Sequence, residues 1–222
     1  MVIINELINA GKIFEKDSKD KYSRYKSWEF CYQKFQESEY DRDELTINLS
    51  LYLASWGMYR GSTFLINKNY KINTGIVDII KEFQKEHSAH NKILNKEQLE
   101  ELIKNDEYFN DIEKLGNKIA EYYYKEIQDK NVTDTLKTKI IMGTIGITPA
   151  YDTYFKESLK DLDEHILKSF KAKSIKQCYE YYNKYYYEFE EIRKNKFEGY
   201  PIMKILDMCL WQYQKNKKDA EK

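Results

Sequence analysis

The sequence predicts an all-α protein. Its apolar residues recur at steps of three and four, the period of one helix face, and almost never alternate with polar residues as in a half-buried strand. The first 148 residues contain no proline, and no Asn-Gly or Asp-Gly pair marks a β-hairpin. We therefore expect a single compact all-α domain over residues 1–214, with about eight helices, and a flexible C-terminal tail at 215–222.

The helices are expected, in chain order, near residues 2–15, 20–38, 42–66, 74–87, 96–128, 133–145, 149–170, 173–195 and 201–215. The long 96–128 range is expected to break around Asn105 to Phe109. No internal repeat and no Gly/Ser-rich linker marks a domain boundary along this series.

The 42–66 helix is expected to be the buried centre of the fold. It is apolar on nearly every side, which is typical of a buried helix. The residues expected to be nearly inaccessible to solvent are Leu49, Leu53, Trp56, Gly57 and Met58. Gly57 and Gly61 lie four residues apart, and their spacing predicts a ridge without side chains where another helix packs closely.

Arg60 is the first candidate site residue. It follows Trp56 by four residues, so the guanidinium and the indole share a helix face. A charge inside a buried helix needs a partner or a wet cleft. Two interpretations stay open: a structural arginine paired with a carboxylate, or an anion-binding arginine at the floor of a pocket.

Residues 133–155 hold the second candidate site. Thr133 is suited to cap a helix, and Gly146 stands where a left-handed residue ends one. Thr148 is expected to cap the next helix, with Pro149 at its first position and Asp152 in its first turn, where a carboxylate suits the helix dipole. This hairpin is either a phosphate-binding corner or simply a tight turn between two core helices.

The Tyr-rich helix 173–195 is the third segment of interest. The spacing predicts a buried stripe of Tyr179, Tyr182, Tyr186 and Phe189, and it leaves Tyr181, Tyr185 and Tyr187 at least partly exposed. Interleaved lysines and tyrosines can stack the bases of a single strand. The alternatives are an ordinary amphipathic surface or a patch through which the protein forms a homo-oligomer.

The residue counts exclude several classes of protein. The 222 residues carry 37 basic and 37 acidic side chains, so binding to duplex nucleic acid mainly by phosphate neutralisation is disfavoured. Only four of the basic residues are arginines. Three cysteines without Cys-x-x-Cys spacing and the lack of a signal peptide favour a reduced, cytoplasmic location, with the thiols acting as small hydrophobes. The most apolar window is too polar to cross a membrane, so no membrane partner is expected.

No cofactor and no metal site are expected. His87 and His90 lie three residues apart, but His165 is the only other histidine, and zinc needs three or four ligands. The Gly-rich nucleotide-binding loops and the Gly-x-Ser-x-Gly motif of hydrolases are absent.

Two resemblances bear on function. The segments LYLASWGMYRGSTFL (51–65) and TKIIMGTIGITPAYDTYF (138–155) resemble an uncharacterised group of bacterial proteins with the same pair of motifs. More remotely, the second segment resembles the helix-hairpin-helix region of DNA base-excision glycosylases. In that family a glycine-rich hairpin grips the DNA backbone, and an aspartate that follows supports loss of the base. Here the glycines are separated by two residues instead of one, and the aspartate follows more closely.

The glycosylase resemblance implies roles for individual residues. Asp152 would be the essential carboxylate and Lys139 the lysine of the hairpin helix, and these two are the candidate catalytic residues. The candidate ligand-binding residues are Trp56, Arg60, Gly143, Gly146 and Tyr151. The first hypothesis is thus a DNA-associated, glycosylase-like protein, perhaps a catalytically degenerate one. The second is a non-enzymatic helical protein that binds another protein or itself through its Tyr-rich helices. We further expect Arg60 and Asp152 to lie in one site.

Overall fold

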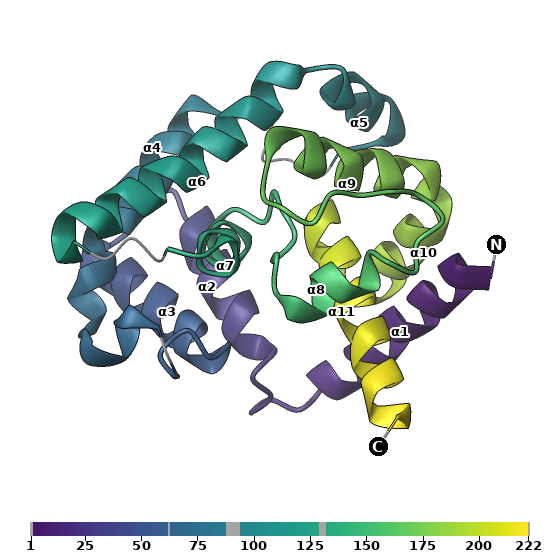
Figure 1. Ribbon diagram of the computed structural model, residues 1–222, viewed down its shortest axis with the longest axis horizontal. Helices are drawn as coiled ribbons and strands as arrows, with labels where there is room; N and C mark the ends of the chain where they lie inside the picture. The colour runs from purple at the N-terminus through teal and green to yellow at the C-terminus, as the bar shows by residue number, and fades with distance from the viewer. Residues whose placement is uncertain (1, 62, 88–93, 129–131, 222) are drawn as a thin grey trace.

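A computed structural model describes residues 2–61, 63–87, 94–128 and 132–221 (Figure 1). Within these ranges the chain forms eleven α-helices and two short 3₁₀ helices, and it contains no β-strand. The prediction of an all-α fold is confirmed, with more helices than the expected eight.

The helices have the following bounds: α1 Val2–Ser18, α2 Lys26–Gln36, α3 Arg42–Ser55, η1 Phe64–Asn67, η2 Tyr70–Asn73, α4 Thr74–Glu86, α5 Lys96–Ile103, α6 Asp106–Ile127, α7 Asp134–Thr144, α8 Thr153–Ser158, α9 Ala172–Lys184, α10 Tyr186–Lys196 and α11 Ile202–Ala220. The predicted break in the 96–128 range is confirmed. It lies between α5 and α6, where the Asn105 side chain accepts a hydrogen bond from the backbone N–H of Tyr108.

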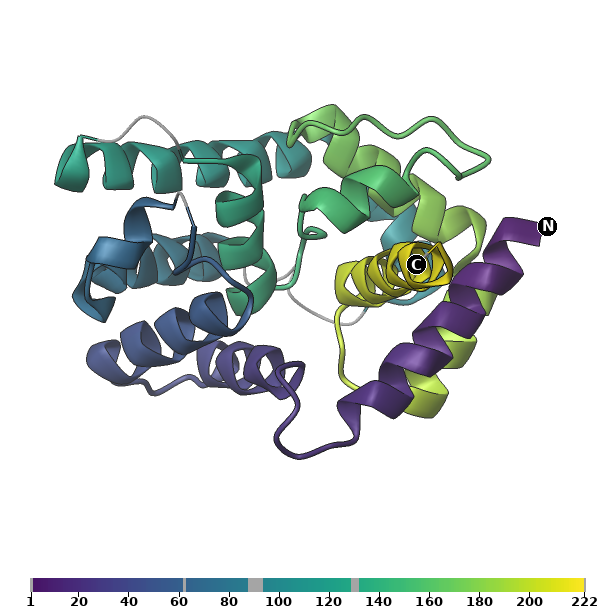
Figure 2. The ribbon, with the colours of Figure 1, turned by 60° about the horizontal axis from the view of Figure 1, so that its bottom comes forward.

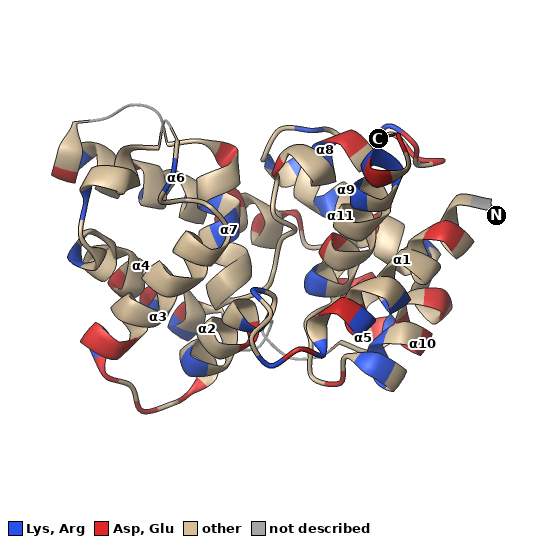
Figure 3. Cartoon of the chain, turned by 90° about the horizontal axis from the view of Figure 1, so that it is seen from below, with Lys and Arg blue, Asp and Glu red and all other residues tan. Residues whose placement is uncertain are grey.

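The helices gather in two groups (Figures 2 and 3). One group contains α2, α3, α4, α6 and α7, and the other contains α1, α5, α8, α9, α10 and α11 (Figure 3). Helix α1 packs along α11 in the second group, while α6 packs against α9 and so joins the two groups. The buried apolar side chains of both groups form one continuous core.

The prediction of a long, central 42–66 helix is wrong. Helix α3 ends at Ser55, because Gly57 adopts a left-handed conformation (φ +78°) and the N–H of Met58 bonds back to the carbonyl of Leu53. Leu49 and Leu53 are fully buried as expected, whereas Trp56, Gly57 and Met58 are only partly buried.

The outer face of α3 also departs from the prediction. Ile47 and Leu51 are exposed, Leu51 by 62%, so the apolar residues around this helix do not make it a core helix. Gly57 ends the helix instead of opening a ridge for a neighbour. Gly61 is also left-handed (φ +65°), and no described residue beyond its chain neighbours has an atom within 4 Å of the position of a Cβ.

The helices buried on all sides are α7 and α11. In α7 every residue from Thr138 to Thr144 is buried, and in α11 every residue from Ile202 to Gln212 is buried. Helix α7 contacts α2, α3 and α6, and it stands near the middle of the molecule in Figure 1. The candidate segment 133–155 therefore starts from a helix whose second half is fully enclosed.

The helix ends in this segment are partly as predicted. Thr133 caps α7 by accepting a hydrogen bond from the N–H of Leu136, and Gly146 follows the helix end with φ +77°. Thr148 and Pro149 do not begin the next helix. Asp152 is the N-cap of α8, because its carboxylate accepts from the N–H of Phe155.

Residues 159–171 are not helical, although a helix was expected over 149–170. Leu159, Ile166 and Phe170 are buried at helix-like spacing. Side chains from elsewhere bond to two backbone N–H groups of this segment. Asp134 accepts from the N–H of Phe170, and Gln177 accepts from the N–H of Leu167. Both N–H groups thus have partners without a helix.

The Tyr-rich segment forms two helices, α9 and α10, with a break at Tyr185. The predicted stripe of Tyr179, Tyr182, Tyr186 and Phe189 is buried. Tyr181 is buried as well, contrary to the prediction, and Tyr185 is partly buried. Of these seven aromatic residues, Tyr187 alone lies largely in solvent, with 70% exposure.

The prediction for the cysteines is confirmed, and the prediction for the C-terminal tail is wrong. Cys31, Cys178 and Cys209 are buried free thiols, as expected of cysteines that serve as small hydrophobes. The residues expected to fray instead continue α11 to Ala220, where Lys217 pairs with Asp161 and Lys218 pairs with Glu157.

Gly143→Ala should destabilise the protein by about 1–2 kcal/mol. An added Cβ would lie 2.3 Å from Cε1 of Tyr52, a buried ring of α3. Overpacking of this kind costs about 1–3 kcal/mol and exceeds the helix-propensity gain of about 1 kcal/mol. Urea unfolding measures the loss. The same change in a Tyr52→Leu background should cost less, and equal losses in both backgrounds would contradict the proposed clash.

Candidate functional site

A cavity of about 360 Å³ lies where the two groups of helices meet. Its walls come from five parts of the chain: Arg24 before α2, the residues after α3, the buried helix α7, the start of α8, and α11. Four charged side chains line it, namely Arg24, Arg60, Lys139 and Asp152. With three positive charges and one negative charge, the cavity is cationic.

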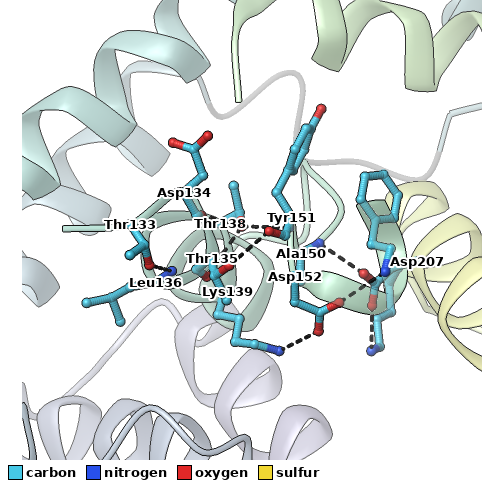
Figure 4. A network of polar contacts seen from close by, with 12 residues as sticks. Thr133, Asp134, Thr135, Leu136, Thr138, Lys139, Ala150, Tyr151, Asp152 and Asp207 are labelled. Atoms are coloured by element: carbon cyan, nitrogen blue, oxygen red, sulfur yellow. Dashed lines mark hydrogen bonds and ion pairs between the residues drawn. The ribbon is translucent and has the colours of Figure 1, made fainter. Parts of the chain in front are cut away.

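An ion pair of Lys139 with Asp152 is the chemically distinctive feature of this cavity. The Nζ atom of Lys139 lies 3.1 Å from Oδ2 of Asp152, and the two side chains are 5% and 16% exposed (Figure 4). Oδ1 of Asp152 is occupied by the N–H of Phe155 at 3.1 Å. The N-cap bond thus fixes one carboxylate oxygen and leaves the other facing the lysine.

Two threonines of α7 hold the Asp152 segment in place. The Thr135 hydroxyl donates to the carbonyl of Tyr151 at 2.9 Å, and the Thr138 hydroxyl accepts from the N–H of Tyr151 at 2.8 Å (Figure 4). Both backbone groups of Tyr151 are therefore bound to the helix that carries Lys139. This explains how two residues thirteen positions apart become a fixed pair.

Aromatic rings form the walls of the cavity. Trp56 and Trp211 meet edge to face with their ring centroids 5.8 Å apart, and Tyr154 lies 5.3 Å from Trp211. The Nζ atom of Lys139 lies 4.9 Å from the centre of the Trp56 ring, within the range of a cation–π interaction. These rings offer flat apolar surfaces beside the ion pair of Lys139 and Asp152.

Arg24 and Arg60 are exposed residues at the edge of the same cavity. The Arg24 guanidinium lies 5.0 Å from the Trp56 ring and 5.5 Å from the Trp211 ring. The Arg60 guanidinium folds over Gly57, where an added Cβ would lie 2.6 Å from Nε of Arg60. Both guanidinium groups therefore lie beside the segment that contains Trp56.

A second, fully buried pair lies behind the first. Nζ of Lys204 lies 3.5 Å from Oδ2 of Asp207, and Oδ1 of Asp207 accepts a hydrogen bond from the N–H of Ala150 at 2.9 Å. Burial lowers the pKa of Lys204. Burial, together with the charge of Asp152, raises the pKa of Asp207. The carboxylate of Asp207 thus anchors the loop that leads into Asp152.

The structure brings four of the seven predicted site residues together. Trp56, Arg60, Lys139 and Asp152 all line the cavity, so the expectation that Arg60 and Asp152 share a site agrees with the structure. Arg60 is an exposed residue at the edge and not one in a buried helix, because α3 ends before it.

The other three predicted residues lie elsewhere in the core. Gly143 packs on the ring of Tyr52, and Gly146 packs on Pro201. Tyr151 is fully buried with its hydroxyl 2.7 Å from that of Ser174, and its side chain points away from Asp152 (Figure 4). All three residues are buried. Gly143 and Gly146 therefore do not lie on an open surface, as hairpin glycines that contact DNA would.

Sequence reasoning missed the other residues that line the cavity. The missed set comprises Arg24, Met58, Thr135, Thr153, Tyr154 and Trp211. A partial signal existed for Arg24, because it is one of only four arginines in the chain. Trp211 had no such signal, since its spacing is that of an ordinary core residue of α11.

The arrangement has three chemical capacities. An amine in contact with a carboxylate can act as a nucleophile after proton transfer to that carboxylate. A carboxylate at the base of a cavity can stabilise positive charge that develops on a substrate. The aromatic walls and guanidinium groups suit a ligand that is planar at one end and anionic at the other.

Comparisons with protein-family models, with curated proteins and with solved structures found no match for this chain. Among the described residues, no group of three His, Cys, Asp or Glu side chains is arranged to hold a metal ion, and His90 lies outside the described ranges. No helix in the described part of the chain combines the length and apolarity that a membrane span requires.

Proposed function

We propose that the protein is a DNA-associated enzyme that binds one unstacked nucleotide in this cavity and releases its base, as DNA glycosylases do. The observation that carries the proposal is the contact between Lys139 and Asp152 at the base of a cationic, aromatic-walled cavity. The resemblance of residues 138–155 to the glycosylase segment assigns the same two residues.

The cavity walls support a nucleobase as the ligand. Enzymes that act on a base take it out of the stack and hold it between aromatic or apolar side chains. Trp56, Tyr154 and Trp211 supply such surfaces. Stacking on aromatic side chains contributes about 1–3 kcal/mol per base. With no net charge on the chain, attraction to DNA would be local to this cavity and not a property of the whole surface.

The proposed reaction uses the ion pair as a nucleophile and a proton carrier. Lys139 first gives a proton to Asp152, and its neutral amine then adds to C1′ of the sugar. The Nζ–C1′ bond forms as the bond between C1′ and the base breaks, and the bond's electron pair leaves with the base. The departing base takes the proton from Asp152, whose regained charge faces the cationic amine. Asp152 then carries one proton from the Nζ ammonium to O4′. The C1′–O4′ bond breaks as the nitrogen electron pair forms the C1′=Nζ bond, which gives a protonated Schiff base and a 4′-hydroxyl.

Borohydride trapping tests this chemistry directly. The sugar of an abasic site is a hemiacetal that opens to an aldehyde at C1′, so an oligonucleotide with such a site reports the amine without knowledge of the preferred base. We expect the wild-type protein to form a covalent complex with it after reduction. Oligonucleotides containing uracil, hypoxanthine or 8-oxoguanine, single-stranded and duplex, then report base release.

Variants separate this reaction from non-specific reaction with surface lysines. Lys139→Met should abolish the trapped complex, and Asp152→Asn should slow its formation because the proton acceptor is lost. Lys118→Met removes an exposed lysine of α6 and should leave trapping unchanged. Equal trapping by Lys139→Met and the wild type would disprove the proposed role of Lys139.

A further inference from the structure

The four arginines of the chain divide into two kinds. Arg42 pairs with Asp78, and Arg193 pairs with Glu190. Arg24 and Arg60 form no ion pair with any carboxylate in the described part of the chain. These two are also the two that line the cavity. The arginines without a protein anion are thus the ones placed where a ligand would bind.

In the described part of the chain, hydrogen bonds engage the guanidinium N–H groups of Arg42 and Arg193, and none engages those of Arg24 or Arg60. Arg24 is held by the faces of Trp56 and Trp211, and a ring face takes up the charge of a guanidinium without occupying its donors. The Arg60 guanidinium lies over Gly57, which has no side chain to displace it. A planar guanidinium with free donors matches the oxygens of a phosphate group.

We infer that Arg24 and Arg60 form a phosphate subsite at the edge of the cavity, beside the aromatic walls that hold the base. This inference rests on the proposed function, because it assigns the ligand as a nucleotide and not as a free base or nucleoside. The phosphate is either the diester of a DNA strand or the monoester of a free nucleotide, and both have the same recognition chemistry.

Binding measurements with the catalytically inactive Lys139→Met variant test the subsite without any reaction. The probes are an eight-nucleotide oligothymidylate, the same oligomer with uncharged methylphosphonate links, thymidine monophosphate and thymidine. Quenching of tryptophan fluorescence reports binding, since two of the chain's three tryptophans line the cavity. We expect each charged probe to bind at least tenfold more tightly than its uncharged counterpart.

The two charged probes distinguish the source of the phosphate. Tighter binding of the oligomer assigns a strand diester, and tighter binding of the monophosphate assigns a free nucleotide. Equal binding of charged and uncharged probes would overturn the inference for both sources.

Arginine variants assign the effect to these side chains. Arg24→Gln and Arg60→Gln should each weaken binding of the oligomer about tenfold, as expected for the loss of a charge-assisted contact. Each should also reduce the slope of log affinity against log salt by about 0.7, the value for one phosphate of a single strand. Arg42→Gln, which removes a paired arginine, should change neither quantity. Unchanged salt slopes in Arg24→Gln and Arg60→Gln would refute the subsite.

Two glycine variants provide a second, sterically matched test. Gly57→Ala and Gly199→Ala both place a side chain at a left-handed φ, so both carry similar backbone strain. Gly57→Ala adds an atom against the Arg60 guanidinium, whereas at Gly199 no described residue beyond its chain neighbours has an atom within 4 Å. We expect Gly57→Ala to weaken binding of the charged probes, with little change for Gly199→Ala. The same affinity in both variants would show that the position of Arg60 does not matter.

Failure of the subsite and failure of the proposed function give different results. Phosphate-dependent binding without borohydride trapping would retain the subsite and reject the base-releasing chemistry. Trapping at an abasic site, together with equal affinity for charged and uncharged probes, would retain the chemistry and reject the subsite.

Discussion

Asp207→Ala should lower the free energy of unfolding by about 3–5 kcal/mol, the cost of removing one partner from a buried ion pair. The change leaves the ammonium group of Lys204, which is 4% exposed, without its carboxylate. It also removes the acceptor for the buried N–H of Ala150. Urea unfolding followed by circular dichroism measures the loss.

Two further variants separate the charge of Asp207 from its hydrogen bond. Asp207→Asn keeps an oxygen that can accept from Ala150, so it should cost less than Asp207→Ala. The double variant Lys204→Met/Asp207→Asn removes both charges and should regain much of the stability, because a buried ion pair contributes little net stability once its desolvation is counted. A double variant as unstable as Asp207→Ala would contradict this interpretation.

The pH dependence of stability should identify the same pair. The folded pKa of Asp207 is raised above 3.8, so its contribution to stability is full below that pH and is lost as pH rises toward the folded pKa. The folded pKa of Lys204 is lowered from 10.5, so its contribution is full above that pH and is lost as pH falls toward the folded pKa. The wild type should therefore lose stability relative to the double variant across both windows. Unfolding curves measured from pH 3 to pH 11 would show it.

Asp152→Ala should also cost about 3–5 kcal/mol, through two effects at one carboxylate. The ammonium group of Lys139, with a side chain 5% exposed, loses its partner. Helix α8 loses the N-cap that accepts from Phe155, which contributes about 1 kcal/mol. Urea unfolding of the purified variant measures the sum, and stability equal to the wild type would contradict the role of the pair.

Removing the lysine of this pair should cost less stability than removing the aspartate. Lys139→Met leaves Asp152 with 16% of its side chain exposed and with its N-cap bond intact, so the remaining charge is better solvated. We expect a loss of about 1 kcal/mol, within the usual range for a point mutant. A double-mutant cycle with Asp152→Ala isolates the coupling between the two residues. Equal losses from the two single variants would mean that the solvent exposure of the remaining charge does not set the cost.

The candidate site was predictable only where local sequence carried a chemical signal. Lys139 and Asp152 were found because their segment resembles a known motif, and Trp56 with Arg60 because a charge stood beside an aromatic residue. Arg24 and Trp211 come from a loop and a core helix far away along the chain. They reach the cavity through the packing of the helix groups, for which the sequence carries no pattern.

The roles of the glycines were also only partly predictable from the sequence. Gly57 was expected to allow close helix packing, yet it ends α3 in the left-handed conformation that glycine adopts most readily. The C-terminal glycine rule that correctly placed Gly146 could have placed Gly57 too. Gly143 does permit close packing, but of the Tyr52 ring and not of DNA.

The sequence by itself determined the all-α class, the start of α7 at Thr133, its end before Gly146, and the break before α6. Each depends on hydrogen bonds between residues at most five apart, so a short stretch of sequence contains all the partners. Only the tertiary structure decided that α7 and α11 are the central helices and that residues 159–171 are not helical. Those outcomes depend on long-range packing and on side chains such as Asp134 and Gln177, whose bonds to distant backbone groups outweigh the local preference for a helix.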